Sequence, residues 1–426
     1  MNLVIAGNGI TGLTAARTVR KVLPRAKIQI VSNESDYPYA RTALMYIFMG
    51  HLKERATECY ERKFYKDNSL ELIRDTALRA DTKACTVYLE SGRTLPYDAL
   101  LIATGSTPSL YDWPGQDLEG VQGLYSLQDL QKLEENARSA HHAVIVGGGL
   151  IGVELAEMLH SRKIPVSMLV RENSYASHIL PPEESELVNF EIRKHRIALH
   201  LGESLKEITG TTRASGVTTV SGREIKCNLV GLTAGVSPNT GFAKASSIDC
   251  ARGVLVSDLF QTNAPGVFAA GDCAQFKEPG GPGRVEQLWY TGRIQGELAG
   301  LQICKMLSGQ TPGAPYQPGV WFNSARFFTL DYQAYGTMPK DSKSVLMIDH
   351  ANQKSIRIAC HGATRAVCGF VLMGIRYRHE VCEKWIQEER SLDYVLANLH
   401  EANFDPEFSK KYEPLVRTQA EKAGFI

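Results

Sequence analysis

The pattern of apolar and polar positions predicts a strand, a tight turn and a helix at the start of the chain. Residues 3–6 form an apolar run of strand type, residues 7–12 are rich in glycine, and residues 13–16 are typical of the opening turn of a helix. The same succession returns at residues 143–159. In such a unit, glycines permit the turn and a close approach of a pyrophosphate, and the helix N-terminus offers free N–H groups to the phosphates. Two units therefore predict two bound dinucleotides.

Composition narrows the class of protein. The 426 residues exceed one ordinary domain, and 43% hydrophobic with 22% charged residues is typical of a globular protein with a sizeable core. A net charge of +1 gives no field that would recruit nucleic acid or an acidic membrane. No apolar run approaches the ~20 residues of a membrane span, and the first strand begins too early for a secretory signal. We expect a cytoplasmic protein.

The cysteines argue against a metal centre. The nine cysteines are scattered along the chain and nowhere form a C-x-x-C pair. Zinc and iron–sulfur ligation usually need closely spaced pairs of this kind. No metal site is therefore expected, and buried or surface thiols are the plain interpretation.

Four further segments match a known pattern. They are YPYARTAL at 37–44, YDALLIATGS at 97–106, LTAGVSPN at 232–239 and TNAPGVFAAGDC at 262–273. With the two glycine turns, they make the chain resemble the FAD-dependent pyridine nucleotide oxidoreductases, in particular ferredoxin and rubredoxin reductases and monodehydroascorbate reductase. The resemblance implies an α/β fold with two Rossmann-like dinucleotide-binding domains, for FAD and NAD(P), and a C-terminal α+β domain.

The resemblance also implies a division of the chain. The FAD-binding domain takes residues 1–112 and 241–312, with the NAD(P)-binding domain, 113–240, inserted between them. Residues 313–426 form an α+β interface domain with a helical tail. The amphipathic helices of that tail, roughly 380–426, either cover this protein's own surface or dock a partner, and periodicity alone does not separate these alternatives.

A hairpin is expected within the C-terminal domain. Residues 355–360 and 366–372 read as two strands that join through a turn at His361-Gly362. From Arg378 onward the pattern becomes helical.

The resemblance places FAD on the first glycine turn. In relatives the arginine that matches Arg41 borders the flavin phosphates, and the aspartate that matches Asp272 accepts a hydrogen bond from the ribityl chain. An acidic side chain about 20 residues past the glycines can bind ribose hydroxyls. Glu34 is the candidate, although a solvated loop glutamate is the alternative. Trp289 is a candidate for an aromatic side chain near the flavin, which packing alone would equally explain. The predicted FAD-binding residues are Gly7, Gly9, Ile10, Thr11, Gly12, Glu34, Arg41, Leu78, Ala103, Thr104, Gly105, Gly271, Asp272 and Trp289.

The second turn is assigned to the nicotinamide cofactor. Gly152 as the last glycine favours NAD by the habit of the family, whereas Arg171, directly after Val170, can pair with a 2′-phosphate. The two signals disagree, and we favour NADH slightly over NADPH. The predicted residues of this site are Gly149, Ile151, Gly152, Arg171 and Gly235.

One carboxylate is a catalytic candidate. In relatives a glutamate in the first turn of the second glycine helix, which matches Glu154, lies near the contact between flavin and nicotinamide. There it could orient the carboxamide or change protonation as charge forms. The alternative is a first-turn glutamate that complements the helix dipole.

The absence of cysteines from one segment indicates how electrons leave the reduced flavin. Relatives that reduce disulfides or peroxide carry a cysteine after the glutamate at 34, and this chain has none between 34 and 57. Electrons from NAD(P)H are therefore expected to leave FAD directly for an external acceptor: a redox protein of ferredoxin or rubredoxin type, a quinone or a small radical. The alternatives are a flavin module like that of nitrite reductase, or an electron-transfer subunit of a larger complex. A homodimer or a complex through the C-terminal domain stays open.

Overall fold

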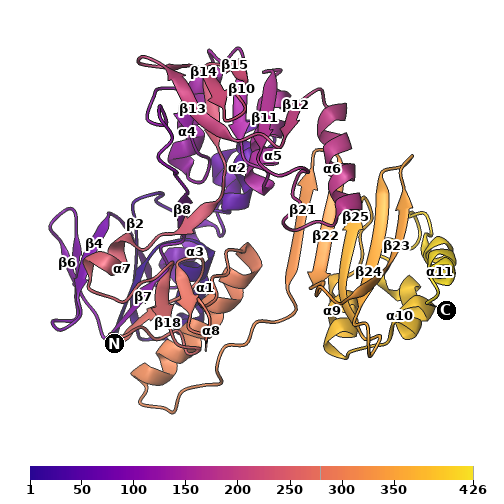
Figure 1. The fold of residues 1–426 in the computed structure, drawn as a ribbon. Helices are drawn as coiled ribbons and strands as arrows, with labels where there is room; N and C mark the ends of the chain where they lie inside the picture. The colour runs from indigo at the N-terminus through magenta and orange to yellow at the C-terminus, as the bar shows by residue number, and fades with distance from the viewer. Residues whose placement is uncertain (279, 426) are drawn as a thin grey trace. The chain divides into compact units, whose positions relative to one another are not determined.

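The computed structural model describes residues 1–278 and 280–425, which form two compact units (Figure 1). Each unit gathers pieces that are distant in sequence. The first unit comprises Met1–Asp112, Val121–Ser139 and Leu232–Gln317, and the second comprises Trp113–Gly120, Ala140–Gly231 and the chain from Pro318 onward.

The first unit is built on a parallel five-stranded sheet. Its strand order is β19-β7-β1-β2-β3, and every neighbouring pair is parallel. Strand β1 is almost wholly apolar and buried, as a strand covered on both faces must be. Helices α1 and α8 lie side by side (Figure 1), because Gly296 and Gly300 of α8 allow close approach to the backbone of α1. The bounds are β1 Asn2–Ala6, α1 Ile10–Val22, β2 Lys27–Ser32, β3 Leu70–Arg74, β7 Ala99–Ile102, β19 Val267–Ala269 and α8 Trp289–Leu307.

Smaller elements surround this sheet. Strands β4, β5 and β6 form an antiparallel sheet, β8 pairs with β17, and β18 pairs with β20. Helix α4 begins at a capping box in which Ser126 and Asp129 bond reciprocally. The bounds are α2 Leu44–Phe48, α3 Arg62–Asp67, β4 Ala77–Asp81, β5 Thr86–Leu89, β6 Thr94–Pro96, β8 Ser106–Pro108, β9 Val121–Gln122, α4 Leu127–Ala137, β17 Val236–Pro238, α7 Gly241–Ala245, β18 Val254–Val256 and β20 Ala274–Phe276, with short 3-10 turns η1 Arg41–Ala43 and η2 Glu54–Thr57.

The second unit contains a second parallel sheet. Strands β12, β11, β10 and β16 are neighbours in that order, and β10–β11 and β11–β12 pair in parallel. Helix α5 follows β10 through the second glycine turn. The bounds are β10 Ala143–Val146, α5 Leu150–Ser161, β11 Val166–Val170, α6 Pro182–Lys194, β12 Ala198–Leu201, β13 Leu205–Gly210, β14 Ala214–Thr219, β15 Glu224–Lys226 and β16 Leu229–Leu232.

An antiparallel sheet with the order β21-β22-β25-β24-β23 forms the C-terminal part of this unit. Strands β24 and β25 are the expected hairpin. The tail helices cover their own sheet, because Trp385, Leu396 and Val416 are buried in one core with its strands. This arrangement favours the first of the two alternatives for the tail. The bounds are β21 Phe322–Phe327, β22 Leu330–Gly336, β23 Lys343–Asp349, β24 Lys354–Cys360, β25 Val367–Met373, α9 His379–Gln387, α10 Leu392–Asn398, η3 Leu399–Ala402 and α11 Glu413–Lys422.

The predicted fold class is confirmed: two parallel α/β sheets and a C-terminal α+β part are present. The domain boundaries remain a prediction. The compact units divide the chain differently, since 121–139 groups with the first glycine turn. Within the residues described, no helix has the length and hydropathy needed to cross a membrane.

Candidate functional site

The first glycine turn is closed on its protein side and open at Gly9. Gly7 has a φ of +117°, and a Cβ there would lie 2.1 Å from the carbonyl oxygen of Ala103. A Cβ on Gly12 would lie 2.1 Å from the Gly7 oxygen, whereas a Cβ on Gly9 would meet nothing within 4 Å. Only glycine fits at positions 7 and 12, and space remains beside Gly9.

The N-terminus of α1 is free to receive an anion. Its N-cap, Gly9, offers no side-chain cap, and the first turn has no acidic residue. The neighbouring Asn8 amide instead donates to Ser35. The exposed N–H groups and the helix dipole therefore suit a pyrophosphate. The first helical residues are Ile10, half-buried, and Thr11, buried.

The second flavin segment meets this turn. Gly271 has a φ of +79°, and a Cβ there would lie 2.4 Å from Thr11 Oγ1. The next residue, Asp272, accepts a hydrogen bond of 2.9 Å from Ser106 Oγ. Burial raises the pKa of the Asp272 carboxyl, and the Ser106 hydrogen bond opposes that rise. The structure thus brings Gly271 and Thr11 together, and their contact with FAD stays a prediction.

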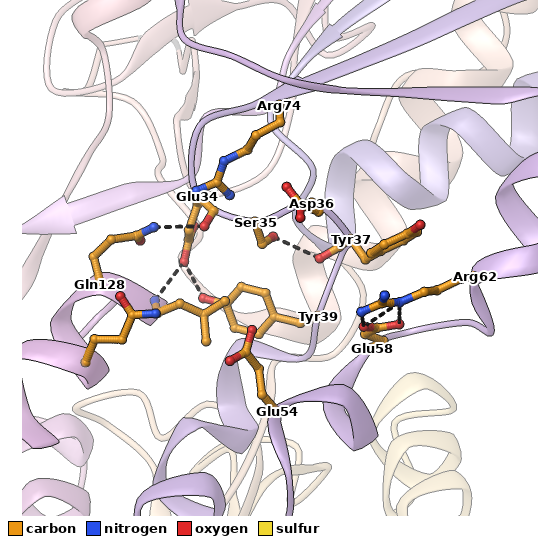
Figure 2. A pocket seen from close by; sticks show the side chains of 12 residues that line it. Glu34, Ser35, Asp36, Tyr37, Tyr39, Glu54, Glu58, Arg62, Arg74 and Gln128 are labelled. Atoms are coloured by element: carbon orange, nitrogen blue, oxygen red, sulfur yellow. Dashed lines mark hydrogen bonds and ion pairs between the residues drawn. The ribbon is translucent and has the colours of Figure 1, made fainter.

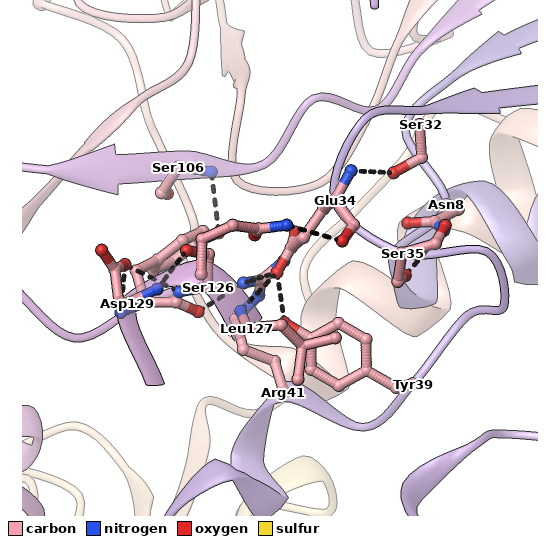
Figure 3. Close-up of polar contacts among 12 residues, drawn as sticks. Asn8, Ser32, Glu34, Ser35, Tyr39, Arg41, Ser106, Ser126, Leu127 and Asp129 are labelled. Carbon is pink, nitrogen blue, oxygen red and sulfur yellow. Dashed lines mark hydrogen bonds and ion pairs between the residues drawn. The ribbon is translucent and has the colours of Figure 1, made fainter. Parts of the chain in front are cut away.

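Glu34 and Arg41 form a paired network (Figure 3). Arg41 donates to both Glu34 oxygens, with Nη1–Oε1 2.8 Å and Nη2–Oε2 2.6 Å. The Tyr39 hydroxyl and, at 3.2 Å, the Leu127 N–H also donate to Oε1. Burial acts to raise the pKa of Glu34, but Arg41 and the other donors outweigh it and hold that pKa below its usual range. Glu34 is therefore an ordered carboxylate, not a solvated loop residue, and its contact with ribose stays a prediction.

A pocket of about 270 Å³ opens beside Glu34 (Figure 2). Arg62 in its wall is paired with Glu58 at 2.6 Å. The lining residues are Glu34, Ser35, Asp36, Tyr37, Tyr39, Glu54, Glu58, Arg62, Arg74, Leu127, Gln128 and Gln131.

The remaining FAD candidates occupy three places in the first unit. Ala103 is buried at the end of β7, and Thr104 Oγ1 donates to the Asn239 oxygen at 2.7 Å. Gly105 has a φ of +68°. Leu78 lies on β4 with 48% of its surface exposed, and Trp289 begins α8 with 37% exposed. That Leu78 and Trp289 lie near bound FAD remains a prediction.

The second glycine turn repeats the first. Gly149 is the N-cap of α5 without a side-chain cap, and a Cβ on it would meet nothing within 4 Å. Tyr175 donates its hydroxyl proton to the Gly149 oxygen at 2.5 Å. Ile151 and Gly152 follow in the first turn of the helix. Gly235, with a φ of +105°, belongs to the first compact unit, whereas the other predicted nicotinamide residues belong to the second.

A carboxylate that the sequence reading missed lies beside this turn. Arg171 is 81% exposed and donates to Glu172 Oε1 at 2.8 Å. The other oxygen of Glu172 is 3.6 Å from where a Cβ on Gly148 would stand. Glu172 follows the end of β11 by two residues, the same offset by which Glu34 follows β2. That repeated offset was the signal available in the sequence.

Glu154 is half-buried and is the fifth residue of α5, beyond the first turn where the sequence had placed it, and that first turn has no acidic residue. Burial, with a smaller contribution from the Glu157 charge, raises the pKa of the Glu154 carboxyl to about 7. A carboxyl with this pKa can exchange a proton near neutral pH. The catalytic role of Glu154 stays a prediction.

Most of the thiols are buried, whereas Cys85 is exposed. All nine are free of disulfides. Burial raises the pKa of the Cys59 and Cys273 thiols, which keeps them protonated and weakly nucleophilic. Within the described part of the chain, no group of three His, Cys, Asp or Glu side chains is placed to hold a metal ion.

Two glycine turns, each behind a parallel strand and before an uncapped helix, define a protein of the two-dinucleotide oxidoreductase class. The sequence profile of the pyridine nucleotide-disulphide oxidoreductase family matches residues 1–296. The chain belongs to this family. Membership implies FAD and a nicotinamide dinucleotide as cofactors.

Individual relatives cover the chain to different extents. The assimilatory nitrate reductase electron transfer subunit of Bacillus subtilis is 30% identical over 375 residues, 87% of this chain and 47% of that protein. The chain thus spans about half the length of that relative. The ferredoxin–NAD(+) reductase component of the p-cumate 2,3-dioxygenase system of Pseudomonas putida is 28% identical over 395 residues, 92% of this chain and 94% of that protein.

A solved structure agrees in fold. The NAD-dependent persulfide reductase from A. fulgidus superimposes with a TM-score of 0.87 at 22% identity, covering 100% of this chain and 84% of that one. At this identity the likeness supports the fold alone.

Proposed function

We propose that this protein is an FAD-dependent NADH oxidoreductase that passes electrons to a separate redox protein of ferredoxin or rubredoxin type. The observation that carries the proposal is the pair of open glycine turns, each at an uncapped helix N-terminus, in a chain that has no cysteine between residues 34 and 57. The first turn takes FAD and the second takes NADH.

The residues of the first unit suit FAD. The free N–H groups of α1 face the open space at Gly9 and bind the pyrophosphate, and Arg41 supplies a fixed cation beside it. Asp272 offers an acceptor to the ribityl chain, and the pocket beside Glu34 receives the adenosine end. Bound FAD takes a hydride from a reduced nicotinamide and can release electrons one at a time.

The acceptor follows from the cysteines and the relatives. No cysteine lies in the segment where disulfide-reducing relatives carry one, and burial raises the pKa of the Cys59 thiol just beyond it. Electrons therefore need no thiol relay. The Pseudomonas putida relative is a ferredoxin–NAD(+) reductase component of similar length, which supports an iron–sulfur protein as the partner over a quinone or a small radical.

Glu172 supports NADH over NADPH. Its carboxylate lies just after the end of β11, beside the glycine turn. An acidic side chain there accepts a hydrogen bond from the ribose 2′-hydroxyl of NADH and repels the 2′-phosphate of NADPH. Arg171 is engaged by that same carboxylate at 2.8 Å. A 2′-phosphate at this position would meet the Glu172 carboxylate as well as Arg171.

Glu154 supplies the proton-linked group. With a pKa of about 7 it holds or gives up a proton at its carboxyl over the working range of pH. We assign it to orienting the carboxamide of NADH and to balancing charge during reduction.

A second function is supported by the Bacillus subtilis relative. That protein is an electron transfer subunit, and this chain covers 47% of it. The alternative makes this protein the flavin-bearing part of a larger assembly. The native mass separates the two: a monomer or dimer that turns over a diffusible iron–sulfur protein contradicts the subunit function.

Anaerobic mixing tests the proposal. Purified protein is expected to carry FAD, and NADH is expected to bleach its absorbance faster than NADPH does. Ferredoxin, rubredoxin, quinone and ferricyanide are then added separately to follow reoxidation. A protein that lacks FAD, or whose FAD neither nucleotide bleaches, refutes the proposal. The cytoplasmic location stays a prediction of the sequence.

A further inference from the structure

Tyr125 is held rigidly at the start of α4. It precedes the N-cap Ser126, and its own N–H donates to Asp129 Oδ2 at 2.9 Å. The helix start is tied in turn to Glu34, which accepts the Leu127 N–H. The backbone that carries the Tyr125 ring is therefore held by Asp129 and by Glu34.

Arg41 lies over this ring. The guanidinium carbon of Arg41 is 4.1 Å from the centre of the Tyr125 ring, and Arg41 Nη1 donates to the Tyr125 carbonyl oxygen. An arginine stacked on an aromatic face loses little further freedom when it binds an anion. Tyr125 thus orients the cation that the sequence assigns to the flavin phosphates.

The hydroxyl of the same ring reaches two other flavin segments. It accepts the Ser106 N–H at 2.9 Å, and a Cβ on Gly105 would stand 3.0 Å from it. Ser106 Oγ in turn donates to Asp272 at 2.9 Å. One side chain therefore connects the segments of Arg41, Gly105 and Asp272.

The proton of that hydroxyl has no acceptor among residues 1–278 and 280–425. Burial raises the pKa of the Tyr125 phenol, so that it is neutral and keeps its proton to donate. A half-buried phenol donor without an acceptor, between residues assigned to one ligand, is suited to bind that ligand.

We propose that Tyr125 binds FAD directly, donating its hydroxyl proton to an oxygen of the ribityl–pyrophosphate segment while its ring holds Arg41 against the phosphates. The inference rests on the proposed function in that the first glycine turn takes FAD. It adds a residue from the segment 121–139, which the sequence assigns to the other cofactor.

The test is the affinity of the apoprotein for FAD, measured by quenching of flavin fluorescence. Tyr125→Phe keeps the ring and removes the hydroxyl, and the dissociation constant for FAD is expected to rise about tenfold, as for one lost hydrogen bond. Tyr125→Leu also removes the stacking surface and is expected to weaken binding further. Tyr394→Phe is the matched control, because its ring also lies under an arginine, with the Arg390 guanidinium carbon 4.7 Å away, on α10.

A second readout separates binding from a purely structural role. The phosphorus resonances of bound FAD are expected to shift in Tyr125→Phe and to stay in place in Tyr394→Phe. A lower melting temperature of the Tyr125→Phe apoprotein, with unchanged affinity and unchanged resonances, overturns the inference.

The two proposals fail in different ways. If the wild-type apoprotein does not bind FAD, the proposed function is refuted and this inference falls with it. If the wild type binds FAD and Tyr125→Phe binds it equally well, only the inference is refuted.

Discussion

Replacing Arg357 by methionine should destabilise the second unit strongly. Arg357, 9% exposed on β24, donates to both oxygens of Glu184 at 2.9 and 3.0 Å, and Glu184 on α6 is fully buried. Two charges at this separation attract by about 5–6 kcal/mol at an effective dielectric constant of about 20. Breaking such a pair leaves a buried charge and costs about 3–5 kcal/mol. The additional bond to Glu183, which is 50% exposed, contributes less than about 1 kcal/mol.

The loss should depend on pH with a definite sign. Burial raises the pKa of Glu184, and Arg357 opposes this rise. Without Arg357 the pKa of Glu184 rises further above its value in the unfolded chain. The folded variant then binds a proton more tightly than the unfolded variant, so its stability increases as the pH falls through the folded pKa. The deficit relative to wild type should therefore shrink as the pH is lowered from 8.

Urea unfolding of the FAD-loaded protein, followed by tryptophan fluorescence, measures both effects. Arg376→Met is the control, because its pair with Asp331 at 3.0 Å involves an arginine that is 54% exposed, and its loss should cost less than about 1 kcal/mol. Combining Arg357→Met with Glu184→Leu should recover most of the stability, since neither charge is then left unpaired. An Arg357→Met protein within about 1 kcal/mol of wild type at pH 8 would refute the reasoning.

Three further outcomes are expected at the two dinucleotide sites. Gly12→Ala places a Cβ 2.1 Å from the Gly7 oxygen and should give protein purified without FAD absorbance, whereas Gly281→Ala, whose Cβ meets nothing within 4 Å, should retain it; equal FAD content in both would contradict this reasoning. In stopped-flow reduction by NADH, the wild-type rate should change around pH 7 and the Glu154→Gln rate should not; the same inflection in both proteins would exclude Glu154. Glu172→Gln should lower the ratio of kcat/KM for NADH to that for NADPH about tenfold, because the repulsion of a 2′-phosphate is removed; an unchanged ratio would count against Glu172.

The sequence predicts well what is decided locally. The first strand, expected at 3–6, is Asn2–Ala6. An apolar run followed at once by glycines indicates a strand that ends in a turn, and Gly7 makes this turn with a φ of +117°, which glycine adopts readily. The hairpin around His361 is equally local, and strands Lys354–Cys360 and Val367–Met373 confirm it.

Contacts between distant segments were beyond the sequence. Tyr125 contacts Arg41 and Ser106 only once the start of α4 lies beside these two segments in the folded unit, and no spacing along the chain predicts that contact. The hydrogen bond from the Leu127 N–H to Glu34, and the burial of the tail helices on their own sheet, are likewise products of tertiary packing. Glu172 was missed because Arg171, the residue directly after β11, was considered instead. It is the Glu172 side chain that lies beside Gly148 of the glycine turn.

The discontinuity of the first unit has a consequence for biosynthesis. Strand β7 ends at Ile102, but its neighbour β19 and the helix that packs on α1 are complete only at Leu307. At typical translation rates this separates the two events by about ten to forty seconds. The contiguous stretch 140–231 leaves the ribosome within that interval and can form its sheet first. The flavin cradle closes late in synthesis, so a chain that stops before α8 is expected to emerge with a folded insert and no site for FAD.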